Sequence, residues 1–117
     1  MRAKTTKLPS PLPADLAEMI ATRLRVIGDA HRIRILDLLR QGELSVNEIT
    51  AQLGTSQQNA SKHLGVLQQA GIVRRRKQGT SVYYSVADQS VYALCEQVCG
   101  GLQLQLSELQ ALIEGTR

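Results

Sequence analysis

The sequence is poor in aromatic residues and in cysteine. Its 117 residues include no Trp, no Phe, three Tyr and two Cys. Sequence-specific RNA binders ordinarily stack bases on aromatic side chains, so this scarcity argues against an RNA-binding role. Two cysteines do not make the disulfide framework of a small secreted domain. We therefore expect a cytoplasmic protein whose thiols are reduced at rest.

Long apolar runs are also missing. No stretch approaches the roughly 18 apolar residues needed to span a bilayer, so we expect no membrane partner. The N-terminal stretch carries Arg2, Lys4 and Lys7 with no long apolar segment behind them, and it is not expected to be a signal peptide. We expect residues 1–13 to form a flexible, Pro-rich basic tail. Residues 14–117 are long enough for one folded domain.

The usual signs of an enzyme are absent as well. The chain has no glycine-rich phosphate loop, no paired carboxylates in a plausible cleft, and no nucleophile spaced beside a histidine. We predict no catalytic residues and a protein that is not an enzyme.

Acidic residues are missing from one contiguous third of the chain. Between Glu48 and Asp88 there is no carboxylate, while Lys62, Lys77 and three arginines give this segment a formal charge of +5. The net charge of the whole chain is +4, so the remainder carries −1. A positive field confined to one segment indicates a polyanionic partner, and a merely solvated basic face is the alternative.

The same segment contains two capped helices joined by a short turn. Ser45 and Glu48 form a predicted capping box for a helix that ends at Gly54, and a second capping box is predicted at residues 55–58. The helix that follows runs over about 56–69, so the pair predicts a helix-turn-helix. Two earlier helices are expected: one over 13/14–27, and one capped by Asp29 and closed at Gly42, with Ile33, Leu36 and Leu39 directed inward.

Polar side chains, none of them a carboxylate, occupy the first two turns of the helix predicted over about residues 56–69. In helix-turn-helix proteins this part enters the major groove, where carboxamides, hydroxyls and lysine reach bases and phosphates. An ordinary solvent-facing helix would mix Glu with Lys. The predicted DNA contacts here are Ser56, Gln57, Gln58, Asn59, Ser61, Lys62 and His63, although His63 lies near the apolar stripe and packing is an equal alternative for it.

After Gly71 the pattern changes from helical to alternating. Two β-prone runs flank a glycine-bearing turn, which predicts a β-hairpin with Val82, Tyr84 and Val86 packed on the helices. A hairpin that follows a recognition helix is a wing, and its basic strand can lie along a phosphate backbone or enter a minor groove. The predicted contacts of the wing are Arg74, Arg75, Arg76, Lys77, Gln78, Gly79 and Thr80.

A long helix capped by Asp88 and ending near Gly115 is expected to complete the domain. Its apolar stripe must bury against the first helix or a second subunit, and a twofold dimer would place two recognition helices about one DNA turn apart. Gly100 and Gly101 are expected to interrupt the helix, and either to bend it or to permit a close contact. The stripe comprises Val91, Leu94, Cys95, Val98, Leu102, Leu106, Leu109 and Ile113.

Two stretches resemble the ArsR/SmtB family of winged-helix repressors. One is GDAHRIRILDLL at positions 28–39, which resembles that family's second helix. The other is SQQNASKHL at positions 56–64, followed by Leu67, AGIV at 70–73, Gly79, Tyr83 and Tyr84; it resembles the recognition helix and wing.

The resemblance covers about residues 14–115. It implies a mainly α (α+β) winged helix-turn-helix fold of about five helices plus a β-hairpin wing. It also implies a homodimer built from the first and last helices, which binds an imperfect palindrome in double-stranded DNA and leaves it when an effector binds.

The effector is open at this point. One family sensor site uses cysteines in the third helix, and residues 45–53 contain none; another pairs carboxylates with histidines along the last helix, and no histidine follows Asp88. His31 and His63 are isolated in the sequence and suggest no site.

Cys95 and Cys99, at i and i+4, share one helix face with Cβ atoms about 6 Å apart. They could bind a soft metal or metalloid such as arsenite, cadmium or copper(I), or react with an oxidant or persulfide. Alternatively the cysteines are structural. The protein then either binds its effector at some other pocket or is a constitutive or architectural DNA binder without an effector.

Overall fold

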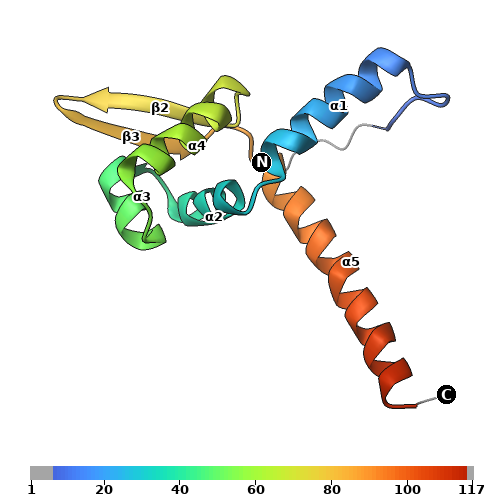
Figure 1. The fold of residues 1–117 in the computed structure, drawn as a ribbon. Helices are drawn as coiled ribbons and strands as arrows, with labels where there is room; N and C mark the ends of the chain where they lie inside the picture. The colour runs from blue at the N-terminus through green and yellow to red at the C-terminus, as the bar shows by residue number, and fades with distance from the viewer. Residues whose placement is uncertain (1–6, 116–117) are drawn as a thin grey trace.

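The computed structural model describes residues 7–115, so the first six residues of the predicted tail lie outside it, and residues 7–13 contain neither helix nor strand. The fold is mainly helical with one small sheet, as predicted (Figure 1). None of the helices described within 7–115 has the length and apolar character to cross a bilayer. In chain order the elements are α1 (Ala14–Ile27), α2 (Ala30–Leu38), a 3-10 turn η1 (Leu39–Gln41), β1 (Leu44–Ser45), α3 (Val46–Leu53), α4 (Gln57–Gln69), β2 (Val73–Gln78), β3 (Ser81–Val86) and α5 (Ser90–Ile113).

Helix α2 begins at its predicted cap but buries a different face from the one predicted. The Asp29 carboxylate accepts hydrogen bonds from the backbone N–H groups of His31 and Arg32, at 2.9 and 3.3 Å. Leu36 and Leu39 are buried, whereas Ile33 is 41% exposed and Ile35 takes its place in the core. At about 100° per residue, Ile35, Leu39 and Leu36 span a face of about 100°, and Ile33 lies about 60° beyond Leu36, at the edge of that face.

The two helices of the helix-turn-helix are both capped. At α3 the predicted capping box is confirmed: Ser45 Oγ accepts from the N–H of Glu48 at 3.1 Å, and the Glu48 carboxylate accepts from the N–H of Ser45 at 2.8 Å. Gly54 ends α3 in the left-handed conformation, with φ 69°, which favours glycine.

The second predicted capping box is wrong by one residue. Ser56 is the N-cap of α4 and accepts from the N–H of Asn59 at 3.0 Å. The third helical position is therefore Asn59 rather than Gln58, and the Asn59 amide donates instead to Thr55 Oγ1 at 2.9 Å.

A three-stranded antiparallel sheet in the order β1-β3-β2 holds the hairpin against the helices. The β2–β3 register runs from Val73 opposite Val86 to Gln78 opposite Ser81, which leaves Gly79 and Thr80 as the turn and confirms the predicted hairpin. Tyr84 and Val86 are buried and Val82 packs on the core, as predicted. Strand β1 was not predicted, because two residues are too short for an alternating pattern.

One core joins α2, α3, α4 and the sheet. Its largest fully buried side chains come from the three helices, from the residue before β2 and from the start of α5: Ile35, Leu36, Ile49, Leu64, Leu67, Ile72 and Val91. The predicted stripe of α4 is confirmed, since Ala60, Leu64 and Leu67 are each at most 1% exposed. The opposite side of α4 consequently remains on the surface.

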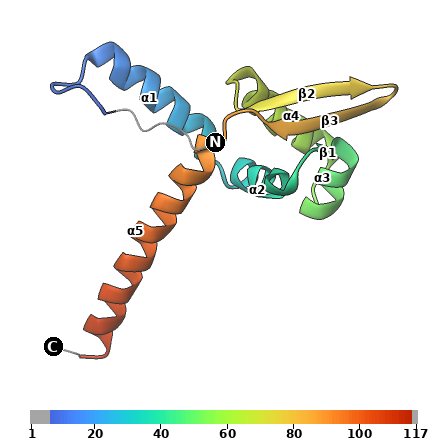
Figure 2. The same ribbon diagram turned by 180° about the vertical axis from the view of Figure 1, so that it is seen from behind.

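Helix α5 extends away from this body (Figures 1 and 2). It runs through Gly100 and Gly101 without a break, so the predicted interruption is wrong. Glycine in a helix interior costs about 1 kcal/mol relative to alanine, which a helix of 24 residues tolerates. Val91 is its one buried side chain, and Tyr92 and Leu94 pack on the core. Cys95 is half-buried, and the other residues of the predicted stripe are exposed; Leu102, Leu106 and Leu109 are 60%, 64% and 53% exposed.

The capping box of α3 gives a prediction for stability. Replacing Ser45 with Ala should lower the free energy of unfolding by about 1 kcal/mol, because the N–H of Glu48 loses its acceptor. Urea unfolding at fixed protein concentration measures this. Asn47→Ala, in the first turn of the same helix, is the matched control and should change stability by less than half as much; equal losses in the two variants would contradict the capping role.

Candidate nucleic-acid interface

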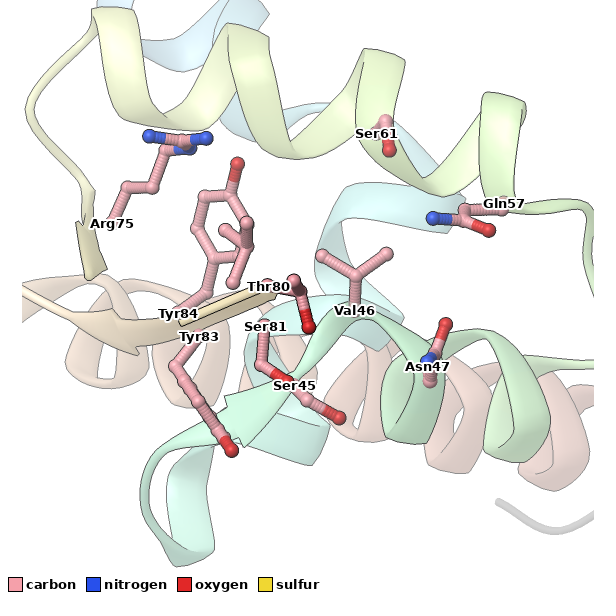
Figure 3. A pocket seen from close by; sticks show the side chains of 11 residues that line it. Ser45, Val46, Asn47, Gln57, Ser61, Arg75, Thr80, Ser81, Tyr83 and Tyr84 are labelled. Atoms are coloured by element: carbon pink, nitrogen blue, oxygen red, sulfur yellow. The ribbon is translucent and has the colours of Figure 1, made fainter. Parts of the chain in front are cut away.

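A polar groove lies between α4, the start of α3 and the hairpin. Its volume is about 450 Å3. Figure 3 shows Gln57 and Ser61 on α4 facing Val46 and Asn47 of α3, with Arg75 and Tyr84 at the hairpin end. The groove thus joins the predicted reading helix to the predicted wing. Its lining consists of Ser45, Val46, Asn47, Gln57, Ser61, Arg75, Thr80, Ser81, Val82, Tyr83 and Tyr84.

The sequence did not lead us to predict that the start of α3 contributes to the interface. Ser45 and Asn47 line the groove because the turn at Gly54 folds α3 back beside the first turn of α4. A helix N-terminus carries partial positive charge, so this lining is compatible with a phosphate. The capping box at residues 45–48 was the available signal, since it marks that helix N-terminus.

The predicted contacts on α4 divide by burial. Gln57, Gln58, Ser61 and Lys62 are exposed, and so is Ser56 at the N-cap. Asn59 is half-buried and donates to Thr55. His63 is 5% exposed and therefore lies beneath the surface that the other side chains form. The structure disagrees with the prediction that His63 contacts DNA and agrees with the packing alternative.

The basic strand β2 places its charges on two faces. Arg75 lies opposite Tyr84 in the register, on the side of the sheet toward the groove, and Lys77 shares that face. Arg74 and Arg76 lie on the other face. All four side chains are exposed, as are Gln78, Gly79 and Thr80 at the hairpin tip.

Arg76 differs from the other basic residues of the wing because its guanidinium already forms an ion pair with Glu43. Its guanidinium donates to both carboxylate oxygens of Glu43, at 2.9 and 2.7 Å, and to Gln78 Oε1 at 2.5 Å. It also lies 4.7 Å from the centre of the Tyr83 ring. The hydrogen bonds from Arg76 lower the pKa of Glu43, and those to Glu43 raise the pKa of Arg76. Glu43 lies outside the acid-free segment in the sequence but beside the wing in the structure, so the positive charge of the wing is lower than its own residues indicate.

The two histidines are not isolated, contrary to the sequence expectation. Their rings stack with centroids 5.1 Å apart, because α2 packs on α4. With Asp29 they bring three metal-ligating atoms within 4.8 Å of one another. However, His63 Nδ1 already accepts a hydrogen bond from Arg32 Nε at 3.2 Å, and Arg32 Nη1 donates to the carbonyl of Val26 at 2.9 Å. A metal ion there would have to displace a cation, so we assign the cluster as a hydrogen-bonded junction between α2 and α4.

The pKa values of this junction follow from burial and hydrogen bonding. Burial lowers the pKa of His63, and the positive charge of Arg32 lowers it further, although the Asp29 carboxylate acts in the opposite direction. Burial raises the pKa of Asp29, but the backbone N–H groups of Arg32 and His31 outweigh this effect and lower it. His63 is therefore a neutral imidazole that accepts from a charged arginine.

The predicted thiol pair lies on α5, away from the groove. Cys95 is half-buried and Cys99 is exposed, and both are free thiols. They line an apolar depression of about 360 Å3 between the end of α1, the start of α2 and α5. The other lining residues are Leu24, Ile27, Gly28, Ile33, Leu94, Val98 and Leu102.

Known proteins resemble this chain in sequence and in fold. A family model described as a helix-turn-helix domain matches residues 27–76. The regulator KmtR of Mycobacterium tuberculosis is 36% identical over 74% of this chain, and the match covers 66% of KmtR. The transcriptional repressor SmtB homolog of Synechocystis is 32% identical, over 81% of this chain and 72% of the relative. This chain belongs to the ArsR/SmtB family of transcriptional regulators.

A solved structure supports the same assignment for this ArsR/SmtB protein. The homodimeric winged helix-turn-helix domain of Mb0332 from Mycobacterium bovis, described as a possible ArsR-family regulator, matches with a TM-score of 0.69 and 33% identity. The match covers 81% of this chain and 88% of that one. The relatives are regulators rather than enzymes, in agreement with the sequence prediction.

The junction gives a prediction for pH dependence. The unfolded histidine has a pKa of about 6.5, and the folded value of His63 is lower. As the pH falls through 6.5, the unfolded chain takes up a proton that the folded protein does not. The free energy of unfolding should therefore decrease by up to about 1.4 kcal/mol per pH unit until the folded pKa is reached.

Urea unfolding between pH 7.5 and 5.5 measures this decrease. His63→Gln should flatten the profile over that range, whereas His31→Gln, which changes an exposed ring of the same stack, should leave the slope close to that of the wild type. A slope that persists in His63→Gln would assign it to another group.

Proposed function

We propose that this protein is a homodimeric, cytoplasmic repressor that binds an imperfect palindrome in double-stranded DNA. The observation that carries the proposal is the groove between α4 and the hairpin, which joins hydrogen-bonding side chains to basic ones. Gln57, Gln58 and Ser61 face outward because Ala60 and Leu64 face the core. In this position α4 enters a major groove with its N-terminal turns against the base edges.

The side chains divide into two roles in this proposal. Gln57, Gln58, Ser61 and Lys62 read base edges or anchor α4, with Ser56 and Asn59 at its start. Arg74, Arg75 and Lys77 follow the phosphate backbone, and the tip at Gln78, Gly79 and Thr80 approaches the adjacent minor groove. His63 is left out because it is buried, and Arg76 contributes less because Glu43 neutralises it.

Dimerisation is supported by the apolar surface of α5 and α1. Val98, Leu102 and Leu106 are 55–64% exposed on one stripe of α5, and Met19 on α1 is 69% exposed. Large exposed apolar side chains gathered on two neighbouring helices are typical of an interface. The homodimeric state of the Mb0332 domain supports a second copy of this chain as the occupant. Twofold symmetry then requires a palindromic operator.

A fluorescence-anisotropy titration with the protein's own upstream DNA tests the proposal. Arg75→Ala should weaken binding to every DNA sequence and reduce the salt slope by about 0.9, because one phosphate contact is lost. Arg76→Ala should have a smaller effect on both quantities. Gln58→Ala should instead reduce the preference for the operator over unrelated DNA, by about 1–3 kcal/mol if the contact is bidentate.

Two results would contradict this assignment of roles. One is a loss of operator preference in Arg75→Ala with none in Gln58→Ala, which would place base recognition in the hairpin. The other is equal salt slopes for Arg75→Ala and the wild type.

For the effector, we propose that Cys95 and Cys99 form the sensing pair. Their sulfur atoms have the i and i+4 spacing at which two thiolates can bind one soft metal or metalloid ion, and they are also open to reactive sulfur or an oxidant. The depression that they line borders α1 and α5, which are the proposed dimer helices. A change there would alter the packing of the subunits.

The same titration, repeated with arsenite, cadmium, a persulfide donor and a disulfide-forming oxidant, tests the pair. At least one agent should weaken DNA binding about tenfold, which corresponds to a coupling of about 1.4 kcal/mol. The double variant Cys95→Ser/Cys99→Ser should bind DNA normally and not respond. If wild type and variant bind alike under every condition, the cysteines are structural, and the protein either binds an effector at another pocket or is a DNA binder without an effector.

A further inference from the structure

The side chain of Arg23 joins three helices. Arg23 lies on α1, and its Nη1 donates to the carbonyl of Ala70, the residue that follows α4, at 2.6 Å. Its Nη2 forms an ion pair with the carboxylate of Asp88, just before α5. One guanidinium therefore links α1 to the end of α4 and to the start of α5.

Asp88 is itself fixed to the first turn of α5. Its Oδ1 accepts from the backbone N–H of Ser90 at 3.0 Å and from Ser90 Oγ at 2.5 Å. Burial raises the pKa of Asp88, but the hydrogen bonds from Ser90 and Arg23 outweigh this effect and lower it. The carboxylate is thus ionised near neutral pH, and the pair with Arg23 holds α1 and α5 together at their junction.

Arg23 also places a positive charge at the C-terminal end of α4. The carbonyl end of a helix carries partial negative charge, which a cation stabilises. The last turn of α4 contains no basic residue of its own. Arg23 supplies that charge from another helix, so the C-terminal end of α4 is attached to α1 and α5.

We propose that Arg23 is a positioning residue for DNA recognition, which sets the orientation of α4 relative to α1 and α5. The proposal rests on the proposed function, in which α4 reads DNA and α1 and α5 form the dimer. Helix α4 has 13 residues and is about 20 Å long, so a small tilt at Ala70 displaces Gln57 and Gln58 at its other end. Effector chemistry at the depression between α1 and α5 would reach α4 by this route.

Arg23→Ala, Arg23→Lys and a matched control test the proposal. Arg25→Ala is the control, because Arg25 is exposed on the same helix and its side chain donates only to Thr22 Oγ1 among the described residues. DNA affinity and its salt slope come from anisotropy, the dimer dissociation constant from sedimentation, and the amide chemical shifts of α4 from NMR. All measurements are made well below the unfolding midpoint of each variant, and Asp88→Asn is the second variant should Arg23→Ala fail to fold.

We expect Arg23→Ala to bind operator DNA about tenfold more weakly, with an unchanged salt slope, at protein concentrations well above the dimer dissociation constant of each variant. Arg23→Lys should be intermediate, since one ammonium cannot bridge both partners as a guanidinium does. The amide signals of Gln57 and Gln58 should shift in Arg23→Ala and stay in place in Arg25→Ala.

Three results would overturn the proposal. The first is wild-type affinity in folded Arg23→Ala. The second is a salt slope reduced by about one, which would make Arg23 a phosphate contact. The third is an unchanged α4 spectrum. If the wild type itself binds no DNA, the proposed function fails, while the α4 spectrum still decides whether Arg23 positions that helix.

Discussion

The packing of Ala60, Leu64 and Leu67 against the core fixes the rotation of α4 about its own axis. These three side chains are buried between α2, α3 and the sheet, and the rest of the domain depends on that contact. With the rotation fixed, Gln57, Gln58 and Ser61 can only face outward. The same core holds Tyr84 and Val86, so the hairpin lies at a defined position beside α4. The groove is a consequence of apolar packing rather than of contacts among the polar residues that line it.

Rotation alone does not determine how α4 is tilted, and two arginines act on that tilt. Arg32 donates to His63 in the middle of the helix, and Arg23 donates to the carbonyl beyond its end. Both also bind backbone or side chains of other segments, the carbonyl of Val26 and the carboxylate of Asp88 respectively. The bonds to His63 and to the two carbonyls place a cation against a neutral acceptor, and the bond to Asp88 places it against a carboxylate; all four are partly buried, where charge-assisted hydrogen bonds are strongest.

The sequence carried enough information for most of the fold. Helix ends were predictable where a residue with a special local role stands there: Asp29 and Ser45 as caps, and Gly54 in the left-handed conformation. Errors arose where two local patterns competed. Thr55 and Ser56 are both good caps, and only the packing of α4 selects Ser56. Gly100 and Gly101 suggest a break, yet the hydrogen bonds of a long helix outweigh two glycines.

What remained hidden were contacts between residues far apart in the chain. The pairs Glu43–Arg76 and Arg23–Asp88, and the stack of His31 on His63, join segments separated by 32 to 65 residues. No periodicity or spacing encodes them, because each depends on how α1, α2 and the hairpin pack. For the same reason the residues that touch DNA stay a prediction even though their exposure is now described.

The exposed apolar stripe of α5 has a consequence for the stability of a single subunit. A helix with one buried side chain obtains little stability from its own subunit, and isolated helices are marginal in water. In the proposed dimer the order of this helix would come from association, so stability would rise with protein concentration. A subunit without its partner would present a leucine-rich segment to proteases and chaperones.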